Sequence, residues 1–155
     1  MSSFQGFFLL QSPHDLLSKL QNDLRRLKSS PTDTYAAFDF FVTAEHLLDW
    51  LYPGTSNKVR RENLRNSNTL LQIVSHIANG SKHFKATAPH HKSVQGTHEK
   101  AGAFQPNAFD PAAFDVGALI IELQGQAASD FGDTIAAEKL AEEVLAFWER
   151  QITSP

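Results

Sequence analysis

Polar side chains recur at helical spacing in one stretch of this 155-residue sequence, between residues 31 and 51. Residues that are four or seven positions apart lie on the same side of an α-helix. The side chains that share this side are Asp39, Thr43, His46 and Trp50. The spacing therefore predicts a polar stripe that could bind a ligand.

A second stripe lies in "SHIANGSKHFK", residues 75–85, where His76, Asn79 and His83 share one side of a helix that continues through Gly80. If the two helices are neighbours, the stripes can meet, and His83 could act as an acid, a base or a ligand. The alternative is that both stripes face solvent. His83 would then simply lie near a helix C-terminus, where the helix dipole favours histidine.

The seven histidines and the absence of cysteine bear on metal binding. Imidazole and carboxylate are common metal ligands, but known sites place them at fixed spacings such as His-Glu-x-x-His. No such spacing occurs here, and the pair His90–His91 lies in a stretch that we expect to be a loop. We therefore predict neither a metal nor another cofactor.

A basic cluster lies between the two stripes, at residues 58–65. The side chains that could contact phosphate groups are Lys58, Arg60, Arg61 and Arg65. The alternative is a solvated helical face, because Glu62 and Asn63 interrupt the run. The formal net charge of the chain is −3, and its C-terminal third is strongly acidic. This charge argues against a nucleic acid that covers the whole surface.

Two helix starts share the pattern Ser-Pro-x-Asp, at residues 12–15 and 30–33. Serine at the N-cap accepts a hydrogen bond from a free backbone N–H, proline suits the first helical position, and aspartate is favourable at the positive helix end. We therefore expect a helix over residues 13–28 and a second from Pro31 to Leu51. Pro53 ends the second helix because proline cannot continue it.

Two further helices are expected from apolar residues at helical spacing. One runs from Asn68 to at least Ala78, after a polar connection with a short helical turn around Val59–Leu64. The other runs from Thr134 to Ile152 and has Asp133 as its cap. These two would be the third and fourth main helices.

The stretch between these two helices has no helical period. Residues 118–125, "ALIIELQG", are β-branched and bounded by glycine, which predicts a strand whose partner lies within residues 84–96. Phe104, Phe109 and Phe114 follow one another at five-residue intervals. We interpret them as anchors that hold a crossover segment against the helices.

Together these elements predict a mainly α-helical single domain over residues 1–155. We expect a four-helix up-and-down bundle with a small β-ribbon between the third and fourth main helices. The N-terminus lacks the basic segment of a signal peptide, and no apolar run is long enough to cross a membrane. We therefore expect a cytoplasmic protein without a membrane partner.

The segment Ala78–His83, "ANGSKH", resembles the signature of the HEPN superfamily of small all-α domains. In that signature an arginine, often followed by asparagine, precedes a histidine near the end of the third long helix. Asn79, Lys82 and His83 match the asparagine, the penultimate lysine and the histidine. The resemblance implies a homodimer with two motifs in one cleft. It also implies nucleotide binding, or metal-independent RNA cleavage in which the histidine acts on the ribose 2′-hydroxyl.

The sequence departs from the signature at Ala78, where the family has the arginine that neutralises phosphate. Our first hypothesis is therefore a module that binds a nucleotide, RNA or a protein partner. The second is a metal-independent endoribonuclease that acts as a dimer, with His83 as general acid or base and Lys82 or a nearby arginine on the phosphate. The third is a structural module that binds proteins through the Phe104–Phe114 segment.

Overall fold

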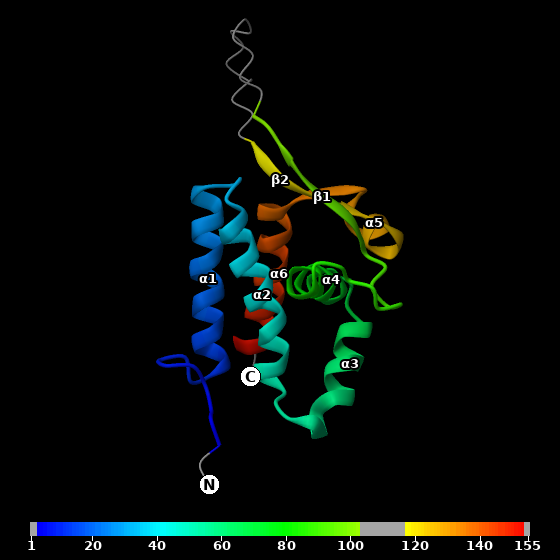
Figure 1. The fold of residues 1–155 in the computed structure, drawn as a ribbon. Coiled ribbons are helices and arrows are strands. Elements are labelled where there is room, and N and C mark those ends of the chain that lie inside the picture. Colours follow the sequence, from blue (N-terminus) through cyan, green and yellow to red (C-terminus); the bar gives the residue numbers. More distant parts are fainter. Residues whose placement is uncertain (1–2, 103–116, 154–155) are drawn as a thin grey trace, which may run out of the picture.

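The computed structural model describes residues 3–102 and 117–153, which form a mainly helical structure with a small antiparallel sheet (Figure 1). The elements, in chain order, are α1 (Pro13–Ser29), α2 (Thr34–Leu51), the 3₁₀ helix η1 (Thr55–Asn57), α3 (Lys58–Asn66), α4 (Thr69–His83), β1 (Val94–Lys100), β2 (Ala118–Leu123), α5 (Gly125–Phe131), β3 (Thr134–Ala136) and α6 (Ala137–Thr153). The predicted Phe104–Phe114 crossover lies outside the described residues.

The long helices α1, α2 and α6 run alongside one another, whereas α4 crosses them. In Figure 1, α1, α2 and α6 run up the page, whereas α4 is seen nearly end-on. α1 packs on both α2 and α6, and α2 packs on α4. The mainly helical fold is thus confirmed. The up-and-down bundle of four helices is not confirmed, because α4 does not run along the other three.

The core lies where these helices meet. Its largest fully buried side chains include Leu20 and Leu27 of α1, Phe40 and Leu47 of α2, and Trp148 of α6. Burying a side chain of this size stabilises the fold by roughly 1.5–3 kcal/mol. In the part of the chain that the structure describes, no helix is both long enough and apolar enough to cross a membrane.

The first Ser-Pro-x-Asp pattern starts a helix as predicted. Ser12 is the N-cap of α1, and its hydroxyl oxygen accepts a hydrogen bond from the backbone N–H of Asp15 at 3.2 Å. Pro13 occupies the first helical position, where its missing N–H costs nothing. The predicted helix over residues 13–28 is confirmed.

The second Ser-Pro-x-Asp pattern starts a helix later than predicted. Asp33, not Ser30, is the N-cap of α2, and its carboxylate accepts hydrogen bonds from the backbone N–H groups of Tyr35 and Ala36. Ser30 instead ends α1, because its own N–H donates to the carbonyl of Arg26 at 3.1 Å. The predicted helix start at residue 31 is therefore wrong.

Helix α4 is the element on which the second stripe depends. It begins at the N-cap Asn68 and continues through Gly80 to His83. It ends where Phe84 adopts φ +64°, a left-handed conformation that cannot continue the helix. Space is open around Gly80, since a Cβ atom built there would meet no atom within 4 Å. Packing therefore does not require glycine at this position.

The sheet has the strand order β1-β2-β3, and both pairings are antiparallel. The strand predicted over residues 118–125 is confirmed as β2, which ends at Leu123, two residues before the predicted end. Its predicted partner is only partly right, because β1 spans Val94–Lys100 and shares only its first residues with the expected 84–96 window. Ile121 of β2 lies opposite Thr97 of β1 and Ile135 of β3.

The segment before α6 differs from the prediction. Gly125–Phe131 forms α5, which the sequence did not indicate, and Thr134–Ala136 forms β3. α6 therefore begins at Ala137 rather than at Thr134. The carbonyl of Asp133 accepts a hydrogen bond from the N–H of Leu123 at 2.8 Å, so this residue continues the strand pairing instead of capping α6.

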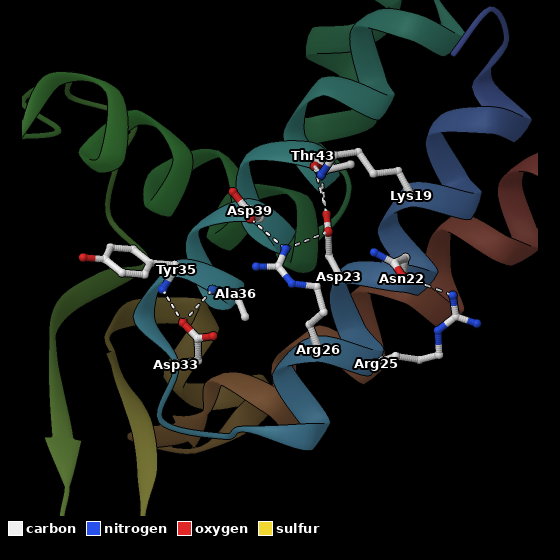
Figure 2. A network of polar contacts seen from close by, with 10 residues as sticks. All are labelled: Lys19, Asn22, Asp23, Arg25, Arg26, Asp33, Tyr35, Ala36, Asp39 and Thr43. Atoms are coloured by element: carbon white, nitrogen blue, oxygen red, sulfur yellow. Dashed lines mark hydrogen bonds and ion pairs between the residues drawn. The ribbon is translucent and has the colours of Figure 1, made fainter. Parts of the chain in front are cut away.

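A buried carboxylate joins α1 to α2 (Figure 2). Asp23 is only 2% exposed, and it accepts hydrogen bonds from Lys19 Nζ at 2.6 Å and from Thr43 Oγ1 at 3.3 Å. Lys19 Nζ also donates to Thr43 Oγ1 at 2.9 Å, and Arg26 lies 3.5 Å from Asp23 and 2.8 Å from Asp39. A buried carboxylate is costly unless its oxygens are bonded. This Asp23 network therefore holds Thr43 against α1.

We expect Asp23→Asn to lower the free energy of unfolding by about 1–3 kcal/mol, because the neutral amide no longer pairs with Lys19 or Arg26 and turns an NH₂ group towards one of these cations. Asp39→Asn removes a half-exposed partner of Arg26 and should cost less than about 1 kcal/mol. Urea denaturation of both variants measures the difference. Equal losses would show that burial of Asp23 does not strengthen its contacts.

Candidate functional site

Helices α2 and α4 border an open groove of about 390 Å³, which we call the polar groove. Its lining residues are Phe38, Val42, Glu45, His46 and Asp49 of α2 and Ala78, Asn79 and Lys82 of α4. Three residues that the sequence singled out, His46, Asn79 and Lys82, therefore line one groove. The two predicted stripes meet, but only in part.

The stripe on α2 is divided between two faces of the helix. Thr43 is buried against α1, and Asp39 forms an ion pair with Arg26 of α1, so both belong to the Asp23 network. Successive residues of a helix are turned by 100°, which places Thr43 about 60° around the axis from His46. That rotation is enough to point Thr43 at α1 while His46 lines the groove towards α4.

His76 of the second stripe holds a strand in place and does not line the polar groove. Its Nδ1 accepts hydrogen bonds from the backbone N–H groups of Val94 at 3.0 Å and Ser93 at 3.3 Å. An Nδ1 that accepts these bonds must be unprotonated. Burial lowers the pKa of His76, and the neighbouring charge of His90 lowers it further. The neutral imidazole thus joins α4 to the start of β1.

His83 lies at the exposed end of α4, outside the polar groove. Within residues 3–102 and 117–153 it forms no hydrogen bond and no ion pair. It follows Lys82 directly, and the 100° step between them turns it away from the groove. Of the three residues that match the HEPN signature, the structure places Asn79 and Lys82 together and leaves His83 apart.

The arginines of the basic cluster contact the end of α2. Arg65 lies 2.6 Å from Glu45, and Arg61 lies 3.1 Å from Asp49. The guanidinium of Arg60 lies over the ring of Tyr52, 4.1 Å from its centroid. Lys58, the fourth side chain of the cluster, lies 3.8 Å from Glu62 on the same helix. The four groups that were predicted to contact phosphate are therefore all engaged within the chain.

These contacts decide the charge of the polar groove. Its two carboxylates, Glu45 and Asp49, are each paired with an arginine. Burial raises the pKa of Glu45, although the charge of Arg65 and its hydrogen bond act in the opposite direction. Lys82 is exposed and has no ion pair with any residue that the structure describes. The groove consequently has one unbalanced cation beside two polar groups, the amide of Asn79 and the imidazole of His46.

A second groove, which we call the apolar groove, has a volume of about 280 Å³ and adjoins the sheet. Its lining residues are Thr34, Ala37, Phe38, Phe41, Ile77, Ser81, Thr97, His98, Glu99, Leu119, Ile120, Ile121 and Ala137. Phe38 lines both grooves and is 48% exposed. The sequence did not point to this groove, because its walls come from pairings between distant segments.

Three histidines gather where α4 meets the loop before β1. The ring of His91 stacks on that of His76 with centroids 5.0 Å apart, and the ring of His90 lies 4.2 Å from that of His91. Among the residues outside 1–2, 103–116 and 154–155, no group of three or more histidines or carboxylates has a geometry that could hold a metal ion. The rings pack against one another and do not converge on a point.

Comparisons of the chain with protein-family models, with curated proteins and with solved structures found no match. The likeness of Ala78–His83 to the HEPN signature remains a hypothesis. The function must therefore be inferred from the geometry of the grooves.

The histidine cluster predicts that acid destabilises the fold. Burial, with smaller contributions from His90, His76 and Arg65, lowers the pKa of His91 to about 4, and its buried Nε2 has no hydrogen-bond partner among the described residues. In the unfolded chain a histidine has a pKa of about 6.5. The unfolded state therefore takes up protons first, and stability is lost as the pH falls from about 6.5 towards 4.

His91→Phe should reduce this pH dependence, because phenylalanine keeps the ring contacts and cannot be protonated. The measurement is the free energy of unfolding in urea at neutral pH and at about pH 5, between the two pKa values. His14→Phe, at an exposed position of α1, is the control. The same pH dependence in all three proteins would contradict the assignment to His91.

Proposed function

We propose that this domain is an HEPN-like module that binds a nucleotide or single-stranded RNA in the polar groove without cleaving it. The observation that supports this proposal most directly is the meeting of His46 with Asn79 and Lys82. They come from two different helices and line the same groove. Two of the three belong to the HEPN-like segment.

The chemistry of the groove suits a phosphate group. The ammonium group of Lys82 supplies a positive charge that no described residue balances, and the Asn79 amide and the His46 imidazole can donate hydrogen bonds. Lysine is a common phosphate ligand in this role of a point charge. Because Arg61 and Arg65 balance the two carboxylates, the groove does not repel an anion as strongly as its composition suggests.

Phe38 can provide the contact for a base. Its half-exposed ring lies between the polar and the apolar groove. Stacking on an aromatic ring stabilises single-stranded nucleic acids by roughly 1–3 kcal/mol per base and tolerates any sequence. A phosphate on Lys82 and a base on Phe38 would together fit one nucleotide.

The same geometry favours binding over cleavage. His83, the proposed acid or base of the ribonuclease hypothesis, is not among the residues that line the groove. Ala78 has no guanidinium, and the three nearest arginines in sequence hold contacts to α2. Lys82 remains as the candidate phosphate partner of the ribonuclease hypothesis, but it lines the polar groove whereas His83 does not, so the two are not brought together in one site.

We expect Lys82→Ala to weaken the binding of a fluorescent, mixed-sequence RNA oligonucleotide about tenfold, which corresponds to one charge-assisted contact of about 1.5 kcal/mol. The slope of log affinity against log salt should become less steep by roughly 0.7, because one fewer counterion is released. Fluorescence anisotropy at several salt concentrations measures both quantities.

Lys58→Ala is the matched control, because Lys58 is an exposed lysine on α3, away from the groove. It should leave the affinity nearly unchanged. If both lysine variants bind equally well, or if the parent protein binds no RNA and no nucleotide, the proposal is wrong. The partner of the groove would then have to be sought among proteins.

A cleavage assay tests the ribonuclease hypothesis directly. We expect no cleavage when the purified protein is incubated with labelled RNA in the presence of a chelator, because neither His83 nor an arginine is among the described residues that line the groove. His83→Ala should behave in the same way. Cleavage by the parent that disappears in His83→Ala would establish the enzyme instead.

A further inference from the structure

The segment before α1 exposes an unusual amount of apolar surface. Phe4 and Leu9 are 90% and 91% exposed, and Phe7 and Phe8 also project into solvent. We call residues 4–10 the N-terminal turn. Single exposed hydrophobic residues are ordinary, but several in a row indicate a contact surface.

The N-terminal turn has a defined backbone conformation. Phe7 and Leu10 exchange backbone hydrogen bonds of 2.8 and 2.9 Å, and the side chain of Gln11 donates to the carbonyl of Phe8. Gly6 has φ +69°, and a Cβ atom there would lie 2.6 Å from the Leu10 carbonyl. Phe8 has φ +51°, which is rare for a large side chain. The turn therefore holds its rings in solvent at the expense of backbone strain.

A second set of exposed apolar side chains lies on α2 and α4, the two helices that line the apolar groove. Tyr35 and the half-exposed Phe38 are neighbours on the surface of α2, and Phe38 lines the groove itself. Phe84 is exposed directly after the last turn of α4, the helix that also lines this groove. Of the large hydrophobic side chains exposed in residues 3–102 and 117–153, only Val59 lies outside the two patches.

The N-terminal turn does not reach the apolar groove of its own chain. The turn precedes α1, whereas the groove is formed by the start of α2 and the sheet. Figure 1 shows these regions at opposite ends of α1. The 17 residues of α1 separate them by about 25 Å. The two exposed apolar patches cannot cover each other within one molecule, but a second copy of the chain can cover both.

We propose that two copies of this chain form a reciprocal dimer in which the N-terminal turn of each copy docks in the apolar groove of the other. A two-fold axis perpendicular to α1 places the N-terminal end of one α1 beside the start of α2 in the second copy, and both contacts then form at once. The groove itself holds Phe7 or Phe8, and the remaining rings lie across Tyr35 and Phe38.

The expected size and charge of this contact suit a stable dimer. Aromatic side chains bury roughly 150–250 Å² each, so two reciprocal contacts bury on the order of 2,000 Å² of both surfaces, the size of a stable interface. Residues 3–13 have no charged side chain, and among the described residues that line the groove Glu99 is the only acidic one. The inference does not rest on the proposed RNA binding: it involves neither Lys82 nor Asn79, and it shares with that proposal only Phe38, which lines both grooves.

A cross-linking experiment tests the geometry, because the native chain has no cysteine. The single variants Gln5→Cys, in the N-terminal turn, and Thr34→Cys, on the rim of the groove, are mixed and oxidised. We expect a disulfide-linked dimer that contains one chain of each kind. A mixture of Gln5→Cys with Glu62→Cys, an exposed position of α3, should give much less of the mixed product. Equal yields in the two mixtures would overturn the proposal.

Sedimentation of the full chain tests the interaction itself. The parent should sediment as a dimer, and Phe7→Ser/Phe8→Ser should sediment as a folded monomer with an unchanged circular dichroism spectrum. Val59→Ser, which removes an exposed apolar side chain elsewhere, should remain a dimer. A monomeric parent, or a dimer that survives the double substitution, contradicts the inference. Binding of a monomeric parent to phosphatidylcholine vesicles through Phe7 and Phe8 would assign the turn to a lipid surface instead.

Discussion

The contact on which the rest of the structure depends is the burial of Asp23 between α1 and α2. A carboxylate in the core has few ways to satisfy its oxygens, and here Lys19 and Thr43 donate to Oδ2 while Arg26 lies 3.5 Å from Oδ1. Because Thr43 must face Asp23, the rotation of α2 about its own axis is fixed. That rotation points Glu45, His46 and Asp49 away from α1 and into the polar groove. One buried charge therefore determines which side chains of α2 are available for binding.

The attachment of α3 follows from the same rotation. None of its residues is fully buried, although Leu64 packs against the edge of the core. It is held by Arg61 on Asp49, by Arg65 on Glu45 and by Arg60 over the Tyr52 ring. Exposed ion pairs contribute little stability, whereas in a pair shielded from water the loss of one partner is costly because it leaves the other charge uncompensated. α3 therefore serves mainly to balance the charge of the groove.

The sequence was most informative where local chemistry decides the outcome. The start of α1 at Ser12 and the strand at residues 118–123 could be predicted because capping and β-branched composition act over a few residues. The start of α2 could not, because Ser30 was already used to end α1. Nor could the start of α6, because pairing with β2 drew residues 134–136 into the sheet. Likewise, the spacing of Asp39, Thr43 and His46 predicts a shared helix side, but only the position of α1 decides which of them a ligand could reach.

Because of Gly80, the last turn of α4 should unfold locally more easily than the first half of the helix. Glycine within a helix costs roughly 0.5–1 kcal/mol relative to alanine, since it has more backbone freedom to lose, and no neighbour here requires its small size. The last turn, which holds Lys82, is also the one that ends at the strained Phe84. This turn should therefore exchange its amide hydrogens faster than the buried first half of the helix. A lysine on such a turn can follow the shape of its ligand, and the ordering of the turn then becomes part of the binding free energy.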